Sequence, residues 1–428
     1  MTTADSPELL ELEVGAIAAG GGCVARAPDG KVVFVRHSLP GERVRAQVTS
    51  STTSYLRADA VEILIASPDR VEPPCPHAGP GRCGGCDFQH VEIGAQRRLK
   101  AFRIAEQLVR LAGVEPAVEV EPVAGDAAGL AYRSRVRVAV DGRGAVGFRR
   151  HRSHRLEYVH ECPIASRAVT ATDALAVLWP GATELEVVTG TGTDATETLV
   201  SVTPRGRSAP RLPDLAAAPG LVVGGKVRRP PGAVHAVVDG RVYRTSPGVF
   251  WQVHTGAAAA LLRAVLDFVG PCDGASVVDL YAGAGLFSVR LADAVGPSGT
   301  VLAVERDRRA CADARHNGAT FPNLRVLEGE VTAALVETGL GRPDIVVLDP
   351  AREGAGTGVM RALAAHAPAV RRVIYVSCDP SSFGRDSRVL LDEGWRLSGL
   401  RAFDIFPMTE HVELVAALEP PAPHVRPR

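Results

Sequence analysis

A cysteine and two carboxylates occur at or near the ends of predicted strands in the C-terminal part of the sequence. Asp349 lies in LDPAREG, Cys378 in VSCDP and Glu413 in FPMTEHVE. Strands alternate with helices here, and in doubly wound sheets ligands bind outside the carboxyl ends of the strands. We therefore expect the three side chains to converge on one crevice. The alternatives are a small buried hydrophobe for Cys378 and a solvated charge on a strand edge for Glu413.

These side chains suit methylation at carbon 5 of a uracil ring, a carbon that is a poor nucleophile on its own. A thiolate from Cys378 that adds to carbon 6 would make carbon 5 nucleophilic enough to attack a sulfonium methyl group. A general base, Glu413, would then remove the carbon-5 proton so that the thiolate can leave. This chemistry needs one nucleophile and one general base, and Cys378 and Glu413 can supply them.

A glycine-rich turn between a predicted strand and a predicted helix, VVDLYAGAGLFSVRLA, has the chain order of a nucleotide-binding site. Gly283 and Gly285 allow a ligand to approach the backbone, and the start of the helix offers free N–H groups. Glu305 ends the next predicted strand, where a carboxylate can accept hydrogen bonds from both ribose hydroxyls. An NAD site or a plain tight turn would also fit. Because the third glycine of dinucleotide sites is missing, the turn favours adenosine with a short amino-acid tail.

Three cysteines cluster in PPCPHAGPGRCGGCDFQ and a fourth follows in HECPIA. They are Cys75, Cys83, Cys86 and Cys162. In a reducing compartment, clustered cysteines bind metal or do chemistry more often than they form disulfides. The spacing suits a site with four thiolates but does not distinguish zinc from an iron–sulfur cluster. The alternative is four unlinked cysteines.

Arginines crowd the segments YRSRVRV and GFRRHRSHR, close in sequence to Cys162. The formal net charge of the whole chain is zero, so this basic cluster is local. A surface that binds the phosphates of RNA is the functional interpretation, and a solvated strand face is the alternative. The residues expected to bind RNA are Arg133, Arg135, Arg149, Arg150 and Arg152.

The elements that must position these residues divide into three expected domains. Residues 1–68 contain five short predicted strands separated by Gly and Pro, which is typical of a small OB-like β-barrel. Residues 69–245 carry the cysteines and form an expected central, strand-rich α+β domain. Residues 246–428 alternate strands with helices, which predicts a doubly wound, Rossmann-like α/β domain with a mostly parallel sheet. A chain of 428 residues is long enough for such an arrangement.

The sequence lacks the features of membrane and secreted proteins. It has no run of 18 or more apolar residues, so no membrane span is expected. The acidic start MTTADSPELLELEVG lacks the basic region and apolar run of a signal peptide. We therefore expect a cytoplasmic protein, acting as a monomer.

Taken together and in this order, the motifs resemble those of the bacterial 23S rRNA and tRNA uridine-5-methyltransferase family over nearly the whole chain. The segment GGGCVARAPDGKVVFVRHSLPGERV resembles the family's N-terminal TRAM domain. VSCDP and FPMTEHVE resemble its nucleophile and base motifs, which implies these roles for Cys378 and Glu413. LDPAREG resembles its LDPPR motif, with Ala351 in place of the second proline, and implies an active-site role for Asp349.

The resemblance also implies S-adenosylmethionine as the methyl donor and a [4Fe–4S] cluster on the four cysteines, with zinc as the alternative. Gln252 in SPGVFWQVH matches the family's glutamine motif, and Tyr281 matches a family aromatic residue. Glu330 takes the place of an aspartate that faces the adenine, while Leu286 replaces a common asparagine. The expected cofactor contacts are Gln252, Tyr281, Gly283, Gly285, Glu305, Glu330 and Asp349.

The expected function is therefore S-adenosylmethionine-dependent methylation of carbon 5 of a uridine in RNA, with 23S rRNA favoured over tRNA, through a covalent cysteine–uracil adduct. The alternatives are a cytosine-5 RNA methyltransferase, a non-catalytic iron–sulfur RNA-binding protein and a small-molecule methyltransferase. The carboxylate base motif argues against the first, and the presence of both Cys378 and Glu413 argues against the second. The N-terminal barrel and the arginine cluster argue against the third.

Overall fold

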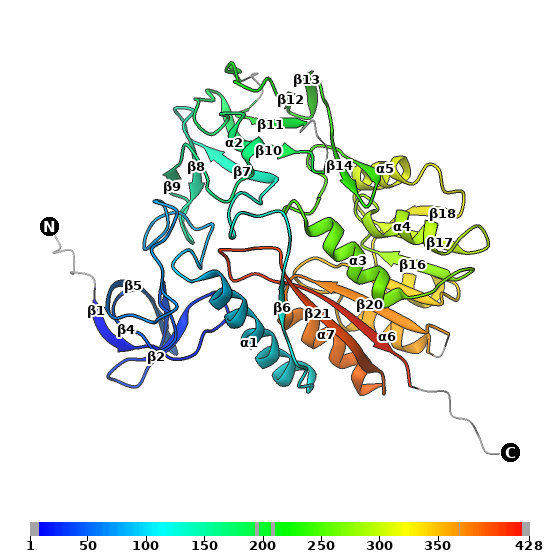
Figure 1. Ribbon diagram of the computed structural model, residues 1–428, viewed down its shortest axis with the longest axis horizontal. Coiled ribbons are helices and arrows are strands. Elements are labelled where there is room, and N and C mark those ends of the chain that lie inside the picture. The colour runs from blue at the N-terminus through cyan, green and yellow to red at the C-terminus, as the bar shows by residue number, and fades with distance from the viewer. Residues whose placement is uncertain (1–7, 193–196, 207–209, 368, 422–428) are drawn as a thin grey trace.

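Three large sheets, joined by a short hairpin, make up the architecture shown by the computed structural model in Figure 1. The structure describes residues 8–192, 197–206, 210–367 and 369–421. A five-stranded sheet lies near the N-terminus, a seven-stranded sheet in the middle of the chain and an eight-stranded sheet in the C-terminal part. This arrangement confirms the expected fold class, an α/β part preceded by a barrel and a strand-rich part.

The N-terminal sheet is a small barrel with the strand order β1-β4-β5-β3-β2. Its strands are β1 (Leu9–Glu13), β2 (Cys23–Arg26), β3 (Val32–Arg36), β4 (Arg43–Ser51) and β5 (Tyr55–Ile65). Alternate side chains point inward, and Val33 and Val35 of β3 are fully buried for this reason. The Gly15 N–H donates to the Val24 carbonyl at 2.7 Å, so the chain just after β1 meets β2 and brings the two outer strands together.

The central sheet has the order β13-β12-β11-β10-β7-β8-β9, and only β11 and β12 pair in parallel. Its strands are β7 (Arg135–Val140), β8 (Val146–Arg149), β9 (Leu156–Tyr158), β10 (Ala182–Thr189), β11 (Thr198–Pro204), β12 (Gly220–Val223) and β13 (Lys226–Arg229). A short helix, α2 (Arg167–Thr170), precedes β10, and the hairpin of β14 (Val234–Val238) and β15 (Arg241–Thr245) follows β13. The arginine-rich turn between β8 and β9 therefore lies at one edge of this sheet.

The C-terminal sheet has the order β18-β17-β16-β19-β20-β22-β21-β6. Its strands are β6 (Val120–Pro122), β16 (Ser276–Leu280), β17 (Thr300–Glu305), β18 (Leu324–Glu328), β19 (Ile345–Leu348), β20 (Arg372–Ser377), β21 (Arg396–Asp404) and β22 (Glu413–Glu419). Its helices are α3 (Ala257–Val269), α4 (Leu286–Ala294), α5 (Arg308–Asn317), the π-helical turn η1 (Leu335–Gly339), α6 (Thr357–Ala365) and α7 (Pro380–Asp392).

Helices cover both faces of this sheet, as expected for a mostly parallel sheet. All four residues of β19 are buried, and Val347 packs with α3 and α4 while Val346 packs with α6 and α7. The first five strands of the order run parallel. β22 lies between β20 and β21 and is antiparallel to both. The start of β22 is therefore at the same edge as the carboxyl ends of the parallel strands.

Two elements from the expected central domain belong to the C-terminal layer. The helix α1 (Ile93–Ala112) begins at Glu92, whose side chain accepts two N–H groups, and ends at Gly113 with φ 71°. It packs against α7, and β6 pairs in parallel with β21 (Figure 1). The expected domain boundaries at residues 68 and 245 therefore remain predictions. Within the described ranges, no helix is both long and apolar enough to cross a membrane.

Candidate active site

The carboxyl edge of the C-terminal sheet brings the three predicted catalytic residues together. Asp349 directly follows β19, and Cys378 directly follows β20. Glu413 is the first residue of β22, which starts at this edge because it runs antiparallel. Ser377 pairs with Leu414 at the end of the pairing between β20 and β22. Cys378 and Glu413 are therefore the next two residues to face each other on these adjacent strands. The topology of the sheet therefore places the candidate nucleophile beside the candidate base.

Three carboxyl groups share this edge, and burial shifts the pKa of each upward. Glu413 is only 4% exposed, and burial, followed by the charge of Asp349, raises its pKa well above the ordinary value. Burial and then the charge of Asp279 raise the pKa of Asp349 to about 7. Burial raises the pKa of Asp279 to about 7, although its carboxylate accepts a hydrogen bond from Ser288. A carboxylate with a raised pKa binds a proton more tightly, which suits a general base.

The thiol of Cys378 carries its proton in this environment. Burial raises its pKa to about 12, the charges of Glu413 and Asp349 add to the rise, and Arg352 opposes it. Formation of a thiolate therefore requires a proton acceptor, and the neighbouring carboxylates can supply one. Arg352 Nη2 also lies 3.0 Å from His411 Nδ1, which links the two carboxylate motifs. Sequence reasoning missed Arg352 and His411, although both stand inside motifs already singled out.

The loop after Asp349 is held in place by a carboxylate of α7. Asp386 is buried, and its Oδ2 accepts the Ala355 N–H at 2.7 Å and the Tyr375 hydroxyl at 2.6 Å. Gly354 has φ 87°, and a Cβ there would come within 2.5 Å of the same oxygen. Only glycine fits this approach, so the loop is fixed against α7.

A buried ion pair from α1 holds the segment that leads to Glu413. We call residues 405–412, between β21 and β22, the base loop. Lys100 Nζ, which is buried, donates to Asp404 Oδ1 at 2.5 Å and to the Phe406 carbonyl at 3.0 Å. Burial lowers the pKa of Lys100, and the charge of Asp404 opposes this change. The ammonium group thus fixes both the end of β21 and the start of the base loop.

The base loop also contacts the cysteine-rich segment and the N-terminal barrel. The Phe88 N–H donates to the Met408 carbonyl at 2.9 Å, and the Met408 N–H donates to Gln96 Oε1 at 2.8 Å. The Gly20 N–H donates to Glu410 Oε2 at 2.7 Å. All three large parts of the chain therefore determine where the base loop lies.

The turn after β16 has the backbone geometry of a ligand-binding loop. Tyr281 and Gly283 adopt φ of 64° and 55°, and a Cβ at Gly283 would meet no atom within 4 Å. Glu305, at the end of β17, accepts the Gly283 N–H at 2.9 Å through Oε2 and the Asp307 N–H at 2.7 Å through Oε1. The carboxylate is thereby fixed next to the open space at Gly283.

The other expected cofactor contacts lie around this loop. Burial raises the pKa of Tyr281 to about 12, and the charges of Asp386 and Glu330 add to the rise, so the three groups are near one another. Glu330 is exposed and follows β18. Gln252 is 7% exposed and lies in the segment before α3.

The four predicted metal ligands lie in one region beside the base loop. Cys86 and Cys162 pack against an apolar group that contains Met408. Burial raises the pKa of Cys83 to about 11, and the charges of Cys162 and Cys75 add to the rise. In the part of the chain that the structure describes, no group of three or more His, Cys, Asp or Glu side chains is arranged to hold a metal ion. The structure therefore brings the cysteines near one another without confirming a cluster.

Two of the predicted RNA-binding arginines donate hydrogen bonds to backbone carbonyls of the protein itself. The side chain of Arg135 is 12% exposed, donates to the Val249 carbonyl at 2.6 Å and lies 3.7 Å from Glu186. Arg133 Nε donates to the Arg135 carbonyl at 2.9 Å. Both side chains hold the start of β7 in place.

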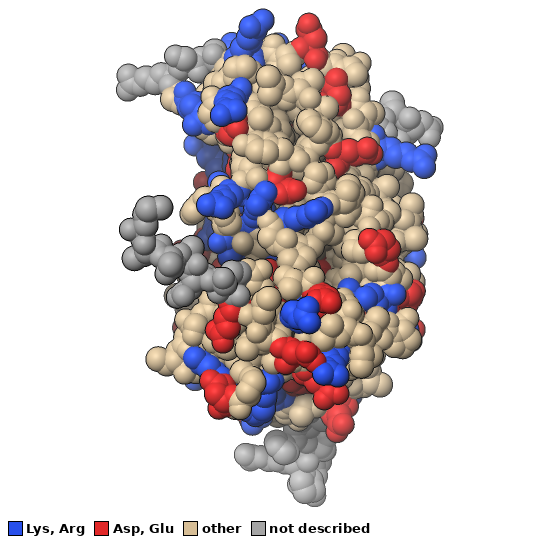
Figure 2. Space-filling view, turned by 90° about the vertical axis from the view of Figure 1, so that its left-hand side faces the viewer, with Lys and Arg blue, Asp and Glu red and all other residues tan. Residues whose placement is uncertain are grey.

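Of the other three, Arg149 is the last residue of β8, and Arg150 and Arg152 lie in the turn between β8 and β9. Arg149 and Arg152 are exposed, whereas Arg150 pairs with Glu157 at 3.0 Å. The Gly84 N–H donates to the Arg149 carbonyl at 3.1 Å, so the cysteine-rich segment supports this turn. Figure 2 views the molecule from the left-hand side of Figure 1, the side on which β8 and β9 lie. Lys and Arg side chains gather at mid-height in this view, and charges of both signs mix below them.

Known proteins are similar in sequence to this chain over nearly its full length. Residues 8–61 match the TRAM domain model. An uncharacterized RNA methyltransferase of Streptomyces avermitilis is 46% identical over 97% of this chain and 99% of its own length. The 23S rRNA (uracil(1939)-C(5))-methyltransferase RlmD of Chromohalobacter salexigens is 34% identical over 97% of this chain and 90% of its own length.

The fold is also that of a solved structure, the Pyrococcus abyssi tRNA (uracil-54, C5)-methyltransferase in complex with S-adenosyl-L-homocysteine. The two chains are 22% identical, with a TM-score of 0.70 over 96% of this chain and 99% of the other. The TRAM match agrees with the expected N-terminal barrel, and the relatives agree with the resemblance carried by the motifs. The chain therefore belongs to the family of RNA methyltransferases that includes the RlmD enzymes.

Proposed function

We propose that the protein methylates carbon 5 of a uridine in RNA, in 23S rRNA rather than tRNA, with S-adenosylmethionine as the methyl donor. The observation that carries this proposal is the position of Cys378 beside Glu413, with Asp349 at the same sheet edge. Relatives named as 23S rRNA (uracil(1939)-C(5))-methyltransferases, 31–34% identical over 91–97% of this chain, support the choice of RNA.

In the proposed reaction, Cys378 acts first and Glu413 acts last. The thiol gives its proton to Asp349 while the sulfur bonds to carbon 6 of uracil, which leaves an enolate across carbons 4 and 5. Carbon 5 then takes the methyl group from the sulfonium donor, which leaves as a neutral thioether. Glu413 removes the carbon-5 proton, the bond between sulfur and carbon 6 breaks, and the thiolate is free again.

We propose that the methyl donor binds over the loop after β16. The open space at Gly283 and the fixed carboxylate of Glu305 support this position, since a strand-end carboxylate can accept from both ribose hydroxyls. Tyr281 and Glu330 would bind the adenine side, while Gln252 and Asp349 would face the reacting methyl group. Gly285, with φ 88°, completes the turn.

Replacement of Glu305 by alanine should weaken S-adenosylmethionine binding by roughly 1.5–3 kcal/mol, the usual contribution of a hydrogen bond to a charged group. Isothermal titration calorimetry measures the change directly. Asp273→Ala is the matched control, because this exposed carboxylate lies before β16, at the opposite end of the sheet. An unchanged affinity in Glu305→Ala would mean that the ribose binds elsewhere.

We propose that the RNA crosses the turn between β8 and β9, where Arg149, Arg150 and Arg152 contact phosphates. The exposure of Arg149 and Arg152 supports direct contact. For Arg133 and Arg135 we propose an indirect role, because both donate to backbone carbonyls within the central part of the chain.

We propose a [4Fe–4S] cluster on the four neighbouring cysteines, Cys75, Cys83, Cys86 and Cys162. Four thiols, the ligand set of such clusters, support it. Methyl transfer needs no electron, so the cluster would act by holding the cysteine-rich segment, whose Phe88 contacts the base loop. The four cysteines and the cluster would then have a structural role and not a redox role.

Protein purified without oxygen should therefore be brown and contain about four iron atoms per chain. Elemental analysis and the visible absorption spectrum measure this. Cys86→Ser should lose the iron, whereas Cys311→Ser, at a buried cysteine on α5, should keep it. Stoichiometric zinc without iron would contradict the cluster.

Mass spectrometry of ribosomal and transfer RNA tests the proposed reaction itself. RNA from a strain that lacks the gene should lose 5-methyluridine at one or more positions of 23S rRNA. The purified protein with S-adenosylmethionine should restore it. Loss of 5-methylcytidine instead would favour the cytosine-5 alternative, and an unchanged content of both would contradict the proposal.

A further inference from the structure

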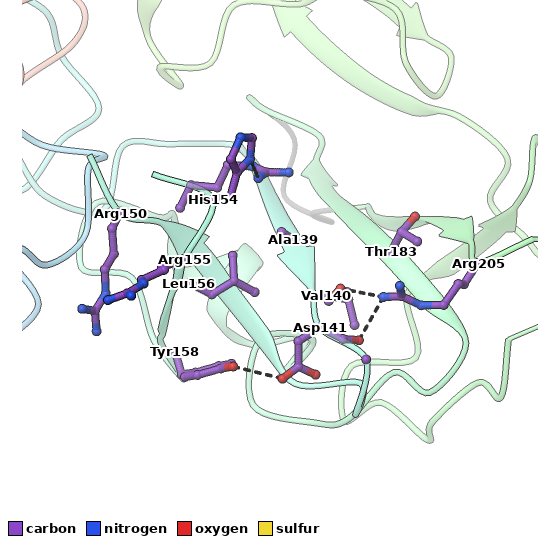
Figure 3. Close-up of a pocket in the computed structure, with 12 residues that line it drawn as sticks. Ala139, Val140, Asp141, Arg150, His154, Arg155, Leu156, Tyr158, Thr183 and Arg205 are labelled. Carbon is purple, nitrogen blue, oxygen red and sulfur yellow. Dashed lines mark hydrogen bonds between the residues drawn. The ribbon is translucent and has the colours of Figure 1, made fainter. Parts of the chain in front are cut away.

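A shallow pocket lies at the edge of the central sheet (Figure 3). None of the residues that line it belongs to the site around Cys378. It has a volume of about 730 Å³. It is lined by the end of β7 and the turn that follows it, the end of β8, the turn between β8 and β9, β9, the start of β10 and the first residue after β11. The lining residues that bear on its chemistry are Arg149, Arg150, His154, Arg155, Tyr158 and Arg205. Small-ligand sites commonly have about 300–1,000 Å³, so a nucleotide fits this volume.

The pocket carries a net positive charge, because four arginines line it together with one carboxylate, Asp141. Glu157 lies 3.0 Å from Arg150 and 3.1 Å from His77. Asp141 accepts the N–H groups of Arg143 and Ala145 through Oδ1, at 2.8 and 2.9 Å. The positive charges of the remaining arginines are therefore available to an anion.

Two of these arginines differ in how firmly they are held. Arg205 Nη2 donates to the carbonyls of Val140 and Asp141, both at 3.1 Å. Figure 3 shows the Arg205 side chain directed at these two residues, at the end of β7. The exposed Arg155 follows Ser153, whose hydroxyl accepts the Arg155 N–H at 3.1 Å. One guanidinium is thus pre-positioned and the other is free to close on a phosphate.

Tyr158 adds an aromatic surface to this basic pocket. It is 51% exposed, an unusual position for a large aromatic ring, and its hydroxyl donates to Asp141 Oδ2 at 3.0 Å (Figure 3). This hydrogen bond fixes the orientation of the ring. Proteins that bind single-stranded nucleic acid combine such rings, on which bases stack, with arginines that follow the backbone.

We propose that this pocket binds an unpaired nucleotide of the RNA substrate, distinct from the target uridine, with its base on Tyr158 and adjoining phosphates at Arg155 and Arg205. The inference rests on the proposed function and names a second RNA contact for it. The segment from Gly84 to Phe88 joins the pocket to the base loop, through its hydrogen bonds to Arg149 and Met408. RNA held in the pocket is thus bound by the same unit that supports the catalytic edge.

Fluorescence anisotropy with a labelled single-stranded RNA oligonucleotide tests the pocket. Tyr158→Ala should weaken binding about tenfold, since a stacked base is lost, whereas Tyr158→Phe should bind nearly as the wild type does. Arg155→Gln should lower the slope of log K against log salt by about 0.7, the value for one phosphate of a single strand. Arg228→Gln, an exposed arginine on β13 at the opposite edge of the same sheet, should change neither quantity.

A duplex of the same sequence separates this pocket from a general basic surface. Duplex binding should not respond to Tyr158→Ala, because paired bases cannot stack on the ring; an equal loss for duplex and single strand would overturn the proposal. An unchanged affinity for single-stranded RNA in both Tyr158→Ala and Arg155→Gln would also overturn it. If the unaltered protein still methylated RNA in that case, the proposed function would stand without the pocket. A wild-type protein that neither binds nor methylates RNA would contradict both.

Discussion

Cys378→Ala is expected to abolish both methyl transfer and covalent attachment of RNA, because the proposed addition to carbon 6 needs this sulfur. Glu413→Gln should behave differently. Addition and methyl transfer still proceed, but removal of the carbon-5 proton slows by roughly 10²–10⁴-fold, the usual effect of losing a general base. Methylated RNA should then stay attached to Cys378 and migrate as a slow band on a denaturing gel.

Matched replacements separate these roles from general damage to the sheet. Cys272→Ala changes a buried cysteine before β16, and Glu419→Gln changes the last residue of β22, at the end away from the crevice. Both should turn over normally without trapped RNA. Covalent RNA on Cys378→Ala, or normal turnover by Glu413→Gln, would show that the roles are assigned wrongly.

RNA that contains 5-fluorouridine extends the same test to the unaltered protein. Fluorine at carbon 5 cannot leave as a cation, so the last step fails after the methyl group has been transferred. The wild type should therefore form the slow band that Glu413→Gln forms with ordinary RNA. Cys378→Ala should form none with either substrate.

Lys100→Met is expected to lower the free energy of unfolding by about 3–5 kcal/mol, the cost of breaking a buried ion pair while its partner stays buried. The partner is Asp404, which retains only the contact with Arg97 at 3.3 Å. Urea unfolding followed by fluorescence measures the change. Arg97→Met should cost about 1 kcal/mol or less, because the Arg97 side chain is 26% exposed and solvent screens its charge.

A double variant distinguishes stability from positioning. Lys100→Met with Asp404→Leu replaces the ion pair by apolar groups and should regain most of the lost stability. It does not restore the donor to the Phe406 carbonyl, so the base loop still lacks this one contact at its start. Accumulated covalent RNA in this stable variant would identify Lys100 as a positioning residue for Glu413. Full turnover by the double variant would reduce Lys100 to a structural role.

The chemical groups of the site could be predicted because each stands beside a strong local signal. Asp349 and Cys378 directly follow apolar strands, and the edge of a parallel sheet is where such residues act. Glu413 was harder, because its place depends on β22 lying antiparallel between β20 and β21. No periodicity in the sequence of β22 encodes that strand order, so the candidate base was identified from a motif and located by the topology.

Contacts between distant segments could not be read from local pattern. Arg135 belongs to a run of arginines, yet its exposure is decided by Glu186 on β10 and by the carbonyl of Val249. In the same way, β6 and α1 look like parts of a central unit but complete the C-terminal layer. These outcomes depend on pairings far apart in the chain, which single segments do not specify.

The insertion of β22 between two strands made before it has a consequence for synthesis. Chains emerge from the ribosome N-terminus first, so Cys378 exists before Glu413 does. Under the proposed mechanism, a partly made chain would hold the nucleophile without the base, and an adduct that it formed with RNA would not be released. Until β22 arrives, however, the edge of β20 is also unpaired and the crevice has no wall. If Cys378 and Glu413 have the proposed roles, attack and release therefore become available in one folding step, so a partly made chain does not become trapped on RNA.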